Sequence, residues 1–328
     1  MKDNYIKNCY KKILAADSVY DIAIKSPTQF APKLSSKLKN NIFIKREDLQ
    51  PVFSFKLRGA YNKISKLKKP GHIIAASAGN HAQGVAMTCK KLKLSSSIVM
   101  PSTTPSIKVN AVKKLGSKVI LAGDTYDEAF DFAIKHAKKN KYEFIHPYDD
   151  LDVIAGQGTI GIELIEQLKE RPDYVFIPVG GGGLLAGIAV YLKIVSPKTK
   201  IIAIEAEDSA CFNLAYKKGK PISLKHVGIF ADGVAVKKIG TKTFKLSKNI
   251  VHQSITVSTD EICSSIKDLY EATRIIDEPA GALSLAGAKK YLLAHNVHNK
   301  NIATIICGAN MNFDRLRHVS ERADIGES

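Results

Sequence analysis

Residues 52–60 read Val-Phe-Ser-Phe-Lys-Leu-Arg-Gly-Ala and place Lys56 between two large apolar side chains. This stretch directly follows residues 42–51, which are typical of a strand and its turn. Because burial disfavours an ammonium ion, a lysine flanked by Phe55 and Leu57 is a candidate for a neutral amine that forms a Schiff base with an aldehyde cofactor. Most lysines are solvated surface charges, so this stretch alone leaves a surface lysine as the simpler interpretation.

A second segment, Ser77-Ala78-Gly79-Asn80-His81-Ala82-Gln83-Gly84, lies between a short apolar run at 72–76 and a helical pattern at 85–92. A strand, a tight turn and a helix N-terminus leave several backbone N–H groups without partners. Such a turn suits a carboxylate or an oxyanion, since Asn80 adds an amide donor and Gly79 permits close backbone approach. An ordinary capped turn between strand and helix is the alternative.

The third segment is Gly180-Gly181-Gly182-Gly183, between an apolar strand run at 174–179 and a helix that ends near Ile194. Four consecutive glycines are explained by a backbone that wraps a phosphate at a helix N-terminus. A rival interpretation fits as well: Gly181-x-Gly183-x-x-Ala186, with Glu205 about 20 residues on, matches the dinucleotide fingerprint of a nicotinamide dehydrogenase. Both interpretations require a phosphate cradle and differ in the cofactor.

The three segments, in this order, resemble the fold-type II pyridoxal-phosphate enzymes, and among them the threonine dehydratases (threonine ammonia-lyases). The similarity runs from Thr28 to about Glu321 and is closest to the biosynthetic branch, which leaves little room for the dehydrogenase. The other stretches that carry it are Lys45-Arg46-Glu47-Asp48, residues 153–159 (Val-Ile-Ala-Gly-Gln-Gly-Thr), residues 205–211 (Glu-Ala-Glu-Asp-Ser-Ala-Cys) and residues 308–313 (Gly-Ala-Asn-Met-Asn-Phe).

This resemblance implies a role for each site residue. Lys56 would carry pyridoxal 5'-phosphate and act as the base, with Phe55 packed beside the cofactor and Asn80 on its ring hydroxyl oxygen. Glu278 would lie near the ring, although a carboxylate that stabilises its own helix N-terminus is an equal alternative. The phosphate would be bound by Gly180, Gly181, Gly182, Gly183 and Leu184, and the substrate carboxylate by the turn Ser77, Ala78, Gly79, Asn80 and His81.

Three positions depart from the patterns of related enzymes. Cys307 stands where threonine dehydratases usually place a serine against the pyridine nitrogen, and its S–H is a weak donor. Ala78 stands where the related serine racemases carry an acid-base serine, so we expect negligible racemisation. The divalent-cation site of those racemases is also incomplete, because Cys211 replaces an expected aspartate beside Glu205. We therefore predict no resident divalent metal.

The implied reaction is α,β-elimination of L-threonine to 2-oxobutanoate and ammonia, the first step of isoleucine biosynthesis. L-Serine should also react, because one methyl contributes only about 1–3 kcal/mol of discrimination in an apolar pocket. A catabolic L-serine/L-threonine dehydratase is the alternative, and a basic binding protein with a decayed enzyme fold is the non-catalytic one. The resemblance ends near Glu321, so we expect no C-terminal regulatory domain and no feedback inhibition by isoleucine. The family likeness also implies a homodimer or homotetramer.

Apolar strand-like runs alternate with helical patterns, at 72–76, 96–100, 118–122, 174–179, 200–204 and 302–307. This alternation predicts an α/β fold with parallel sheet covered by helices, and Thr125 and Glu128 predict a capping box. The resemblance implies two open, parallel-rich sheets flanked by helices, like the β subunit of tryptophan synthase. A small domain at 53–152 would be inserted in a large one formed by residues 1–52 and 153–328.

The net charge of +18 is carried by lysine rather than arginine, 42 residues against 7. Arginine is the residue suited to bidentate phosphate contacts, and the lysines are dispersed, so a solvated basic surface is favoured over a nucleic-acid partner. The five cysteines show no metal-ligand spacing and suit reduced thiols, and no run has signal-peptide or membrane-spanning length. We therefore expect a cytoplasmic enzyme that acts on a small molecule, without a membrane partner.

Overall fold

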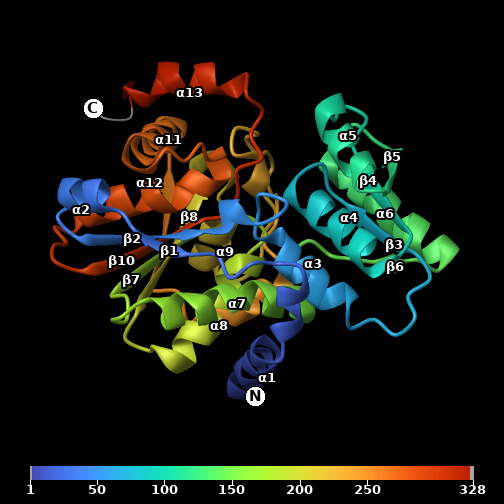
Figure 1. The fold of residues 1–328 in the computed structure, drawn as a ribbon, viewed down its shortest axis with the longest axis horizontal. Coiled ribbons are helices and arrows are strands. Elements are labelled where there is room, and N and C mark those ends of the chain that lie inside the picture. The colour runs from blue at the N-terminus through green and yellow to red at the C-terminus, as the bar shows by residue number, and fades with distance from the viewer. Residues whose placement is uncertain (1, 326–328) are drawn as a thin grey trace.

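The computed structural model describes residues 2–325 and contains two separate sheets, each flanked by helices (Figure 1). The larger sheet has the order β1-β2-β10-β7-β8-β9, and only β1 is antiparallel to its neighbour. Its strands are β1 (Thr28–Phe30), β2 (Asn41–Arg46), β7 (Tyr174–Pro178), β8 (Lys200–Ala206), β9 (Gln253–Val257) and β10 (Asn301–Ile306). The strands β7 and β10 are almost wholly buried, as expected for parallel strands covered on both faces.

The smaller sheet is entirely parallel and has the order β5-β4-β3-β6. Its strands are β3 (Ile73–Ala76), β4 (Ser96–Met100), β5 (Lys118–Leu121) and β6 (Glu143–Phe144). The helices α4 (Asn80–Leu92), α5 (Ser106–Lys114) and α6 (Tyr126–Asn140) surround it, on the right in Figure 1. The predicted capping box opens α6: Thr125 accepts from the Glu128 N–H at 3.3 Å, and Glu128 accepts from the Thr125 N–H at 3.1 Å.

Helices cover both faces of the larger sheet (Figure 1). One face is covered by α7 (Leu151–Gln167) and α8 (Gly183–Val195), with α1 (Lys2–Leu14) packed outside them. The other face carries α2 (Pro32–Leu38), α11 (Thr259–Thr273), α12 (Pro279–Ala294) and α13 (Arg315–Ala323). The remaining elements are α9 (Cys211–Lys218), α10 (Thr241–Ser247) and the short 3-10 turns η1 (Asp17–Asp21), η2 (Glu47–Leu49), η3 (Glu207–Ser209) and η4 (Asp232–Val234).

The helix α3 (Lys56–Ile64) lies between the two sheets and packs on both α4 and α7 (Figure 1). The observed architecture confirms the predicted α/β class with two parallel-rich sheets. The strands β1, β6 and β9 were not predicted. Among residues 2–325, none of the helices combines the length and apolar character needed to cross a bilayer. Residue 1 and residues 326–328, the ends of the predicted large domain, lie outside the described residues.

Candidate active site

One cavity of about 890 Å³ lies between the two sheets, and every site residue that was predicted from the sequence lines this cavity. These residues come from five separate places in the chain, and the cavity brings them together. They are Phe55, Lys56, Ser77, Ala78, Gly79, Asn80, His81, Gly180, Gly181, Gly182, Gly183, Leu184, Glu278 and Cys307.

The backbone that precedes Lys56 is tied to the end of β10. The Phe55 N–H donates to the Cys307 carbonyl at 3.3 Å, and the Ala309 N–H donates to the Phe53 carbonyl at 2.9 Å. Lys56 is the first residue of α3, so these two bonds fix the point at which the helix begins.

The side chain of Lys56 faces the cavity, with its amine 5.3 Å from the centre of the Phe55 ring. Burial lowers the pKa of Lys56, although the nearby Cys307 and Glu278 act in the opposite direction. A lowered pKa raises the fraction of neutral amine, which is the form that attacks a carbonyl or takes up a proton. The site therefore contains a lysine suited to both tasks.

The glycine turn, residues 180–183, joins β7 to α8 at the cavity wall. Gly182 has φ +89°, a left-handed conformation that favours glycine. A Cβ on Gly181 would lie 2.2 Å from the ring of Tyr148, so only glycine fits there. Within the described residues the backbone N–H groups of 180 to 185 donate no hydrogen bond. Unpaired N–H groups at a helix N-terminus form a site for a phosphate group.

The substrate-turn candidate, residues 77–81, joins β3 to α4 on the opposite wall. The Gly79 N–H donates to Ser77 Oγ at 3.2 Å, whereas the N–H groups of Ala78, Asn80 and His81 donate to no residue within 2–325. Burial lowers the pKa of His81 to about 3, aided by the charge of Lys56, so its imidazole is neutral. The turn thus offers free N–H donors to an anion without a charged histidine.

Glu278 belongs to a hydrogen-bonded group with two asparagines. Its Oε1 accepts from Asn80 Nδ2 at 2.7 Å, its Oε2 accepts from the Asn310 N–H at 3.0 Å, and Asn310 Nδ2 donates to Asn80 Oδ1 at 2.7 Å. The Asn80 amide is therefore held in one orientation, and one of its two amide hydrogens remains for a ligand.

Burial and the nearby Asp232 raise the pKa of Glu278 to about 7. The carboxyl makes no capping bond to its own helix, α12, so the structure favours the interpretation of Glu278 as a group that faces the cavity.

Cys307 follows β10 at the floor of the cavity and is buried. Burial and the carboxyl groups of Glu278 and Asp277 raise the pKa of its thiol well above the usual value, so the sulfur stays protonated. The thiol donates to the Ala280 carbonyl at 3.4 Å. The residue that the family resemblance places against the pyridine nitrogen is therefore a neutral thiol.

Glu205 is not part of this cavity. It is fully buried, and its two oxygens accept from the N–H groups of Phe212 and Asn213, both at 2.7 Å, at the start of α9. A carboxylate occupied in this way cannot hold a ribose, which removes the support for the dehydrogenase interpretation. Residues 2–325 contain no group of three or more histidine, cysteine, aspartate or glutamate side chains arranged to hold a metal ion.

Three residues that shape the site were not predicted. Tyr148 packs its ring on Gly181, and Thr243 Oγ1 donates to the Gly181 carbonyl at 2.8 Å. Asn310 lies in a stretch that carried the family resemblance, but no local pattern pairs it with a side chain 230 residues away. Lys108 of α5 and Asp232 of η4 also line the cavity and form an ion pair of 2.6 Å.

Comparisons with known proteins agree with this geometry. The family model described as "Pyridoxal-phosphate dependent enzyme" matches residues 19–308. The biosynthetic L-threonine dehydratase of Pasteurella multocida is 52% identical over 321 residues, which cover 97% of this chain and 62% of that protein. The corresponding protein of Haemophilus influenzae is 53% identical over 313 residues, 94% of this chain and 61% of that protein. The chain thus spans less than two thirds of the length of these curated relatives.

Solved structures are similar over nearly the whole chain. The processed form of threonine deaminase isoform 2 from Solanum lycopersicum has a TM-score of 0.94 and 46% identity, and the match covers 98% of this chain and 94% of that one. The serine racemase of Dictyostelium discoideum has a TM-score of 0.86 and 30% identity, with 93% and 99% covered. The fold, the cavity and these similarities together establish that the chain belongs to the pyridoxal-phosphate dependent enzyme family.

Proposed function

We propose that this chain catalyses the pyridoxal-phosphate dependent α,β-elimination of L-threonine to 2-oxobutanoate and ammonia, the first step of isoleucine biosynthesis. The observation that carries the proposal is a lysine amine with a lowered pKa in one cavity with two turns that expose free backbone N–H groups. The relatives named as biosynthetic threonine dehydratases support the choice of substrate.

The residues present fit pyridoxal phosphate. The unpaired N–H groups of 180–185, at the N-terminus of α8, suit its phosphate, and the free amide hydrogen of Asn80 suits its ring hydroxyl oxygen. Lys56 would hold it covalently, with Phe55 beside it and Cys307 at the ring nitrogen. When bound, the cofactor supplies an electron sink for the charge that develops at the substrate Cα.

The protein supplies binding, orientation and proton transfer. The substrate carboxylate would be held in the turn Ser77, Ala78, Gly79, Asn80 and His81 by its free N–H groups, those of Ala78, Asn80 and His81. Once the substrate amine has replaced it on the cofactor, Lys56 Nζ would take the Cα proton in its neutral form. The β-hydroxyl leaves as water, with the proton that Lys56 Nζ took from Cα. Hydrolysis of the released enamine consumes one water, so the net products are 2-oxobutanoate and ammonia. The side chain of Ala78 cannot donate a proton to Cα, which agrees with elimination rather than racemisation.

The decisive experiment compares Lys56→Ala with Lys63→Ala, a control on the same helix. Borohydride reduction followed by peptide mass spectrometry should find the cofactor on Lys56 in the wild type and in Lys63→Ala, and nowhere in Lys56→Ala. Threonine turnover should be lost only in Lys56→Ala. Attachment at another lysine, or turnover that persists without Lys56, would refute the proposal. A kcat/KM higher for L-serine than for L-threonine would instead favour a catabolic dehydratase.

The proposal extends to organisation and assembly. Residues 53–152 would form a small domain within a large one made of 1–52 and 153–328, which agrees with the membership of the two sheets. A homodimer or homotetramer is proposed on the family likeness alone. The five free, buried cysteines support a reducing compartment such as the cytoplasm.

A further inference from the structure

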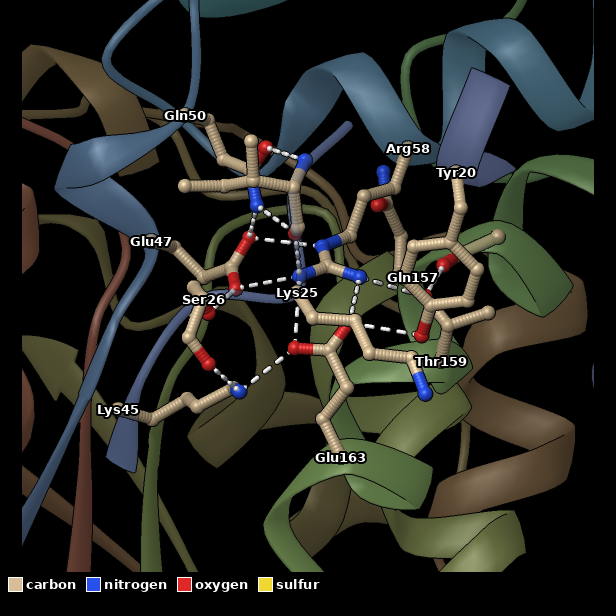
Figure 2. Close-up of polar contacts among 12 residues, drawn as sticks. Tyr20, Lys25, Ser26, Lys45, Glu47, Gln50, Arg58, Gln157, Thr159 and Glu163 are labelled. Atoms are coloured by element: carbon tan, nitrogen blue, oxygen red, sulfur yellow. Dashed lines mark hydrogen bonds and ion pairs between the residues drawn. The ribbon is translucent and has the colours of Figure 1, made fainter. Parts of the chain in front are cut away.

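Four fully buried charged side chains form a network outside the cavity (Figure 2). We call Lys45, Glu47, Arg58 and Glu163 the Arg58 network. Arg58 binds Glu47 through Nε at 2.8 Å and Nη2 at 2.8 Å, and it binds Glu163 through both Nη atoms. Lys45 binds Glu163 at 2.6 Å. With two cations and two anions, the network is formally neutral.

The guanidinium group of Arg58 is fully used. Besides the two carboxylates, Nη1 donates to Thr159 Oγ1 at 3.0 Å and Nη2 donates to the Ile24 carbonyl at 3.1 Å. Burial alone would lower the pKa of Arg58, but the charges of Glu47 and Glu163 outweigh it and raise the pKa. A planar donor group bound on all sides has one permitted position, unlike a lysine ammonium on a flexible stem.

Arg58 is the third residue of α3, and Lys56 is the first. The partners of Arg58 lie on other elements: Glu47 is in η2, whereas Thr159 and Glu163 are in α7. The network therefore connects the first turn of α3 to both η2 and α7, at a position two residues after Lys56.

Beyond the network, the contacts continue through backbone rather than through flexible side chains. A Cβ on Gly156 of α7 would lie 2.5 Å from the Arg58 carbonyl oxygen. A Cβ on Gly187 of α8 would lie 2.6 Å from the Gly158 N and the Ile154 carbonyl oxygen of α7. The glycine turn opens α8. Lys56 and the glycine turn are thus connected through three helices whose backbones touch, which leaves little room for adjustment.

Stability alone does not explain why these four charged side chains are buried together. A buried group of ion pairs pays a large desolvation cost, and well-packed apolar side chains of similar volume are often equally or more stabilising. Such a network can instead specify one arrangement of the elements that it joins.

We propose that Arg58 is a positioning residue, which locks the first turn of α3 onto α7 and so fixes the Lys56 amine relative to the glycine turn. This inference rests on the proposed role of Lys56. Positioning of this kind matters for rate, because a misplacement of about 1 Å costs on the order of 10²-fold in turnover.

Lys45 provides a matched control. It is as buried as Arg58 and shares Glu163 with it, but it lies on β2 and its amine donates hydrogen bonds to Ser26, Glu163 and Gln167, none of which belongs to α3. Both Arg58→Lys and Lys45→Met weaken the network and should lower Tm. Only Arg58→Lys should loosen α3. Thr159→Val is a milder variant of the same kind, since it removes one acceptor of Arg58 and no charge.

The first measurement does not depend on activity. In cofactor-free protein, the rate of reductive methylation of Lys56 by formaldehyde and cyanoborohydride is followed against pH by peptide mass spectrometry. Because burial lowers the pKa of Lys56, displacement of its amine toward water should move the midpoint up toward that of an ordinary lysine. Arg58→Lys and, to a smaller extent, Thr159→Val should show this movement, and Lys45→Met should keep the wild-type midpoint.

The second measurement is the kinetics of L-threonine turnover. Arg58→Lys should reduce kcat on the order of 10²-fold with little change in KM, whereas Lys45→Met should retain both. Equal effects of Arg58→Lys and Lys45→Met, or no movement of the Lys56 midpoint in either, would overturn the inference. If Arg58→Lys does not fold, Thr159→Val against Lys45→Met decides in the same way. Failure of the wild type to attach the cofactor at Lys56 would instead refute the proposed function.

Discussion

Replacement of Glu278 by glutamine should flatten the dependence of stability on pH. Burial, followed by the charge of Asp232, raises the pKa of Glu278 from 4.5 to about 7. A change of this size corresponds to about 3 kcal/mol between the protonated and ionised forms of the folded protein. Glutamine cannot ionise, so the variant does not carry this cost.

The sign follows from proton binding. The folded protein retains the Glu278 proton to a higher pH than the unfolded chain does. The stabilising effect of protonation is therefore complete below about pH 4.5 and is lost as the pH rises through about 7. Between these values the free energy of unfolding of Glu278→Gln should fall by about 3 kcal/mol less than that of the wild type. At any single pH the new amide also meets the Asn80 donor, at a cost of about 1–3 kcal/mol, so the slopes are compared rather than the absolute values.

The assay is urea unfolding of the cofactor-free protein, followed by circular dichroism at several pH values from about 5 to 8. Glu205→Gln is the control, because burial raises the pKa of Glu205 to about 8 at a position outside the cavity. Both variants should have flatter curves, but only Glu278→Gln should change the pH profile of kcat for threonine. Parallel stability curves for the wild type and Glu278→Gln would refute the reasoning.

Two further substitutions test the cavity walls. Gly181→Ala would press a Cβ into the ring of Tyr148. Urea unfolding should therefore show a loss of stability of about 1–3 kcal/mol, and calorimetry should show a weaker affinity for pyridoxal phosphate. Gly71→Ala is the control: its Cβ would meet no atom within 4 Å, so stability and affinity should both stay at the wild-type value. Equal affinity for both variants would contradict the cradle. Cys307→Ser exchanges one neutral donor for another, so kcat should change by less than about tenfold. A loss of several hundredfold would mean that the sulfur has a more specific role.

The sequence was a good guide to elements with a strong local pattern. The buried strands β3, β4, β7 and β10 are short apolar runs bounded by turns, and each was expected within one or two residues of its observed bounds. The strands β1 and β6 were missed because they have three and two residues, too few for a periodic pattern. The strand β9 is mostly half-buried, and its polar residues hide the pattern.

The candidate site divides in the same way. The glycine turn and the 77–81 turn could be named from sequence because each is a local strand-turn-helix signal. The pairing of Glu278 with Asn310 and the packing of Tyr148 on Gly181 could not, because they depend on how distant segments meet. Arg58 was read only as part of the stretch around Lys56, since burial of a charge leaves no mark on local composition. The domain boundaries came from resemblance and stay a prediction.

The isolated bridge between Ser54 and Gly308 sets a condition on the order in which the molecule can be built. These two residues are about 250 positions apart, and the strand β10 that leads to Gly308 is also the neighbour that β2 requires on one side. A ribosome must therefore release the chain at least as far as Gly308 before the loop in front of Lys56 acquires its anchor. Nascent chains that end before β10 should be unable to bind pyridoxal phosphate at Lys56. We therefore expect cofactor attachment to be a late step in the maturation of each molecule.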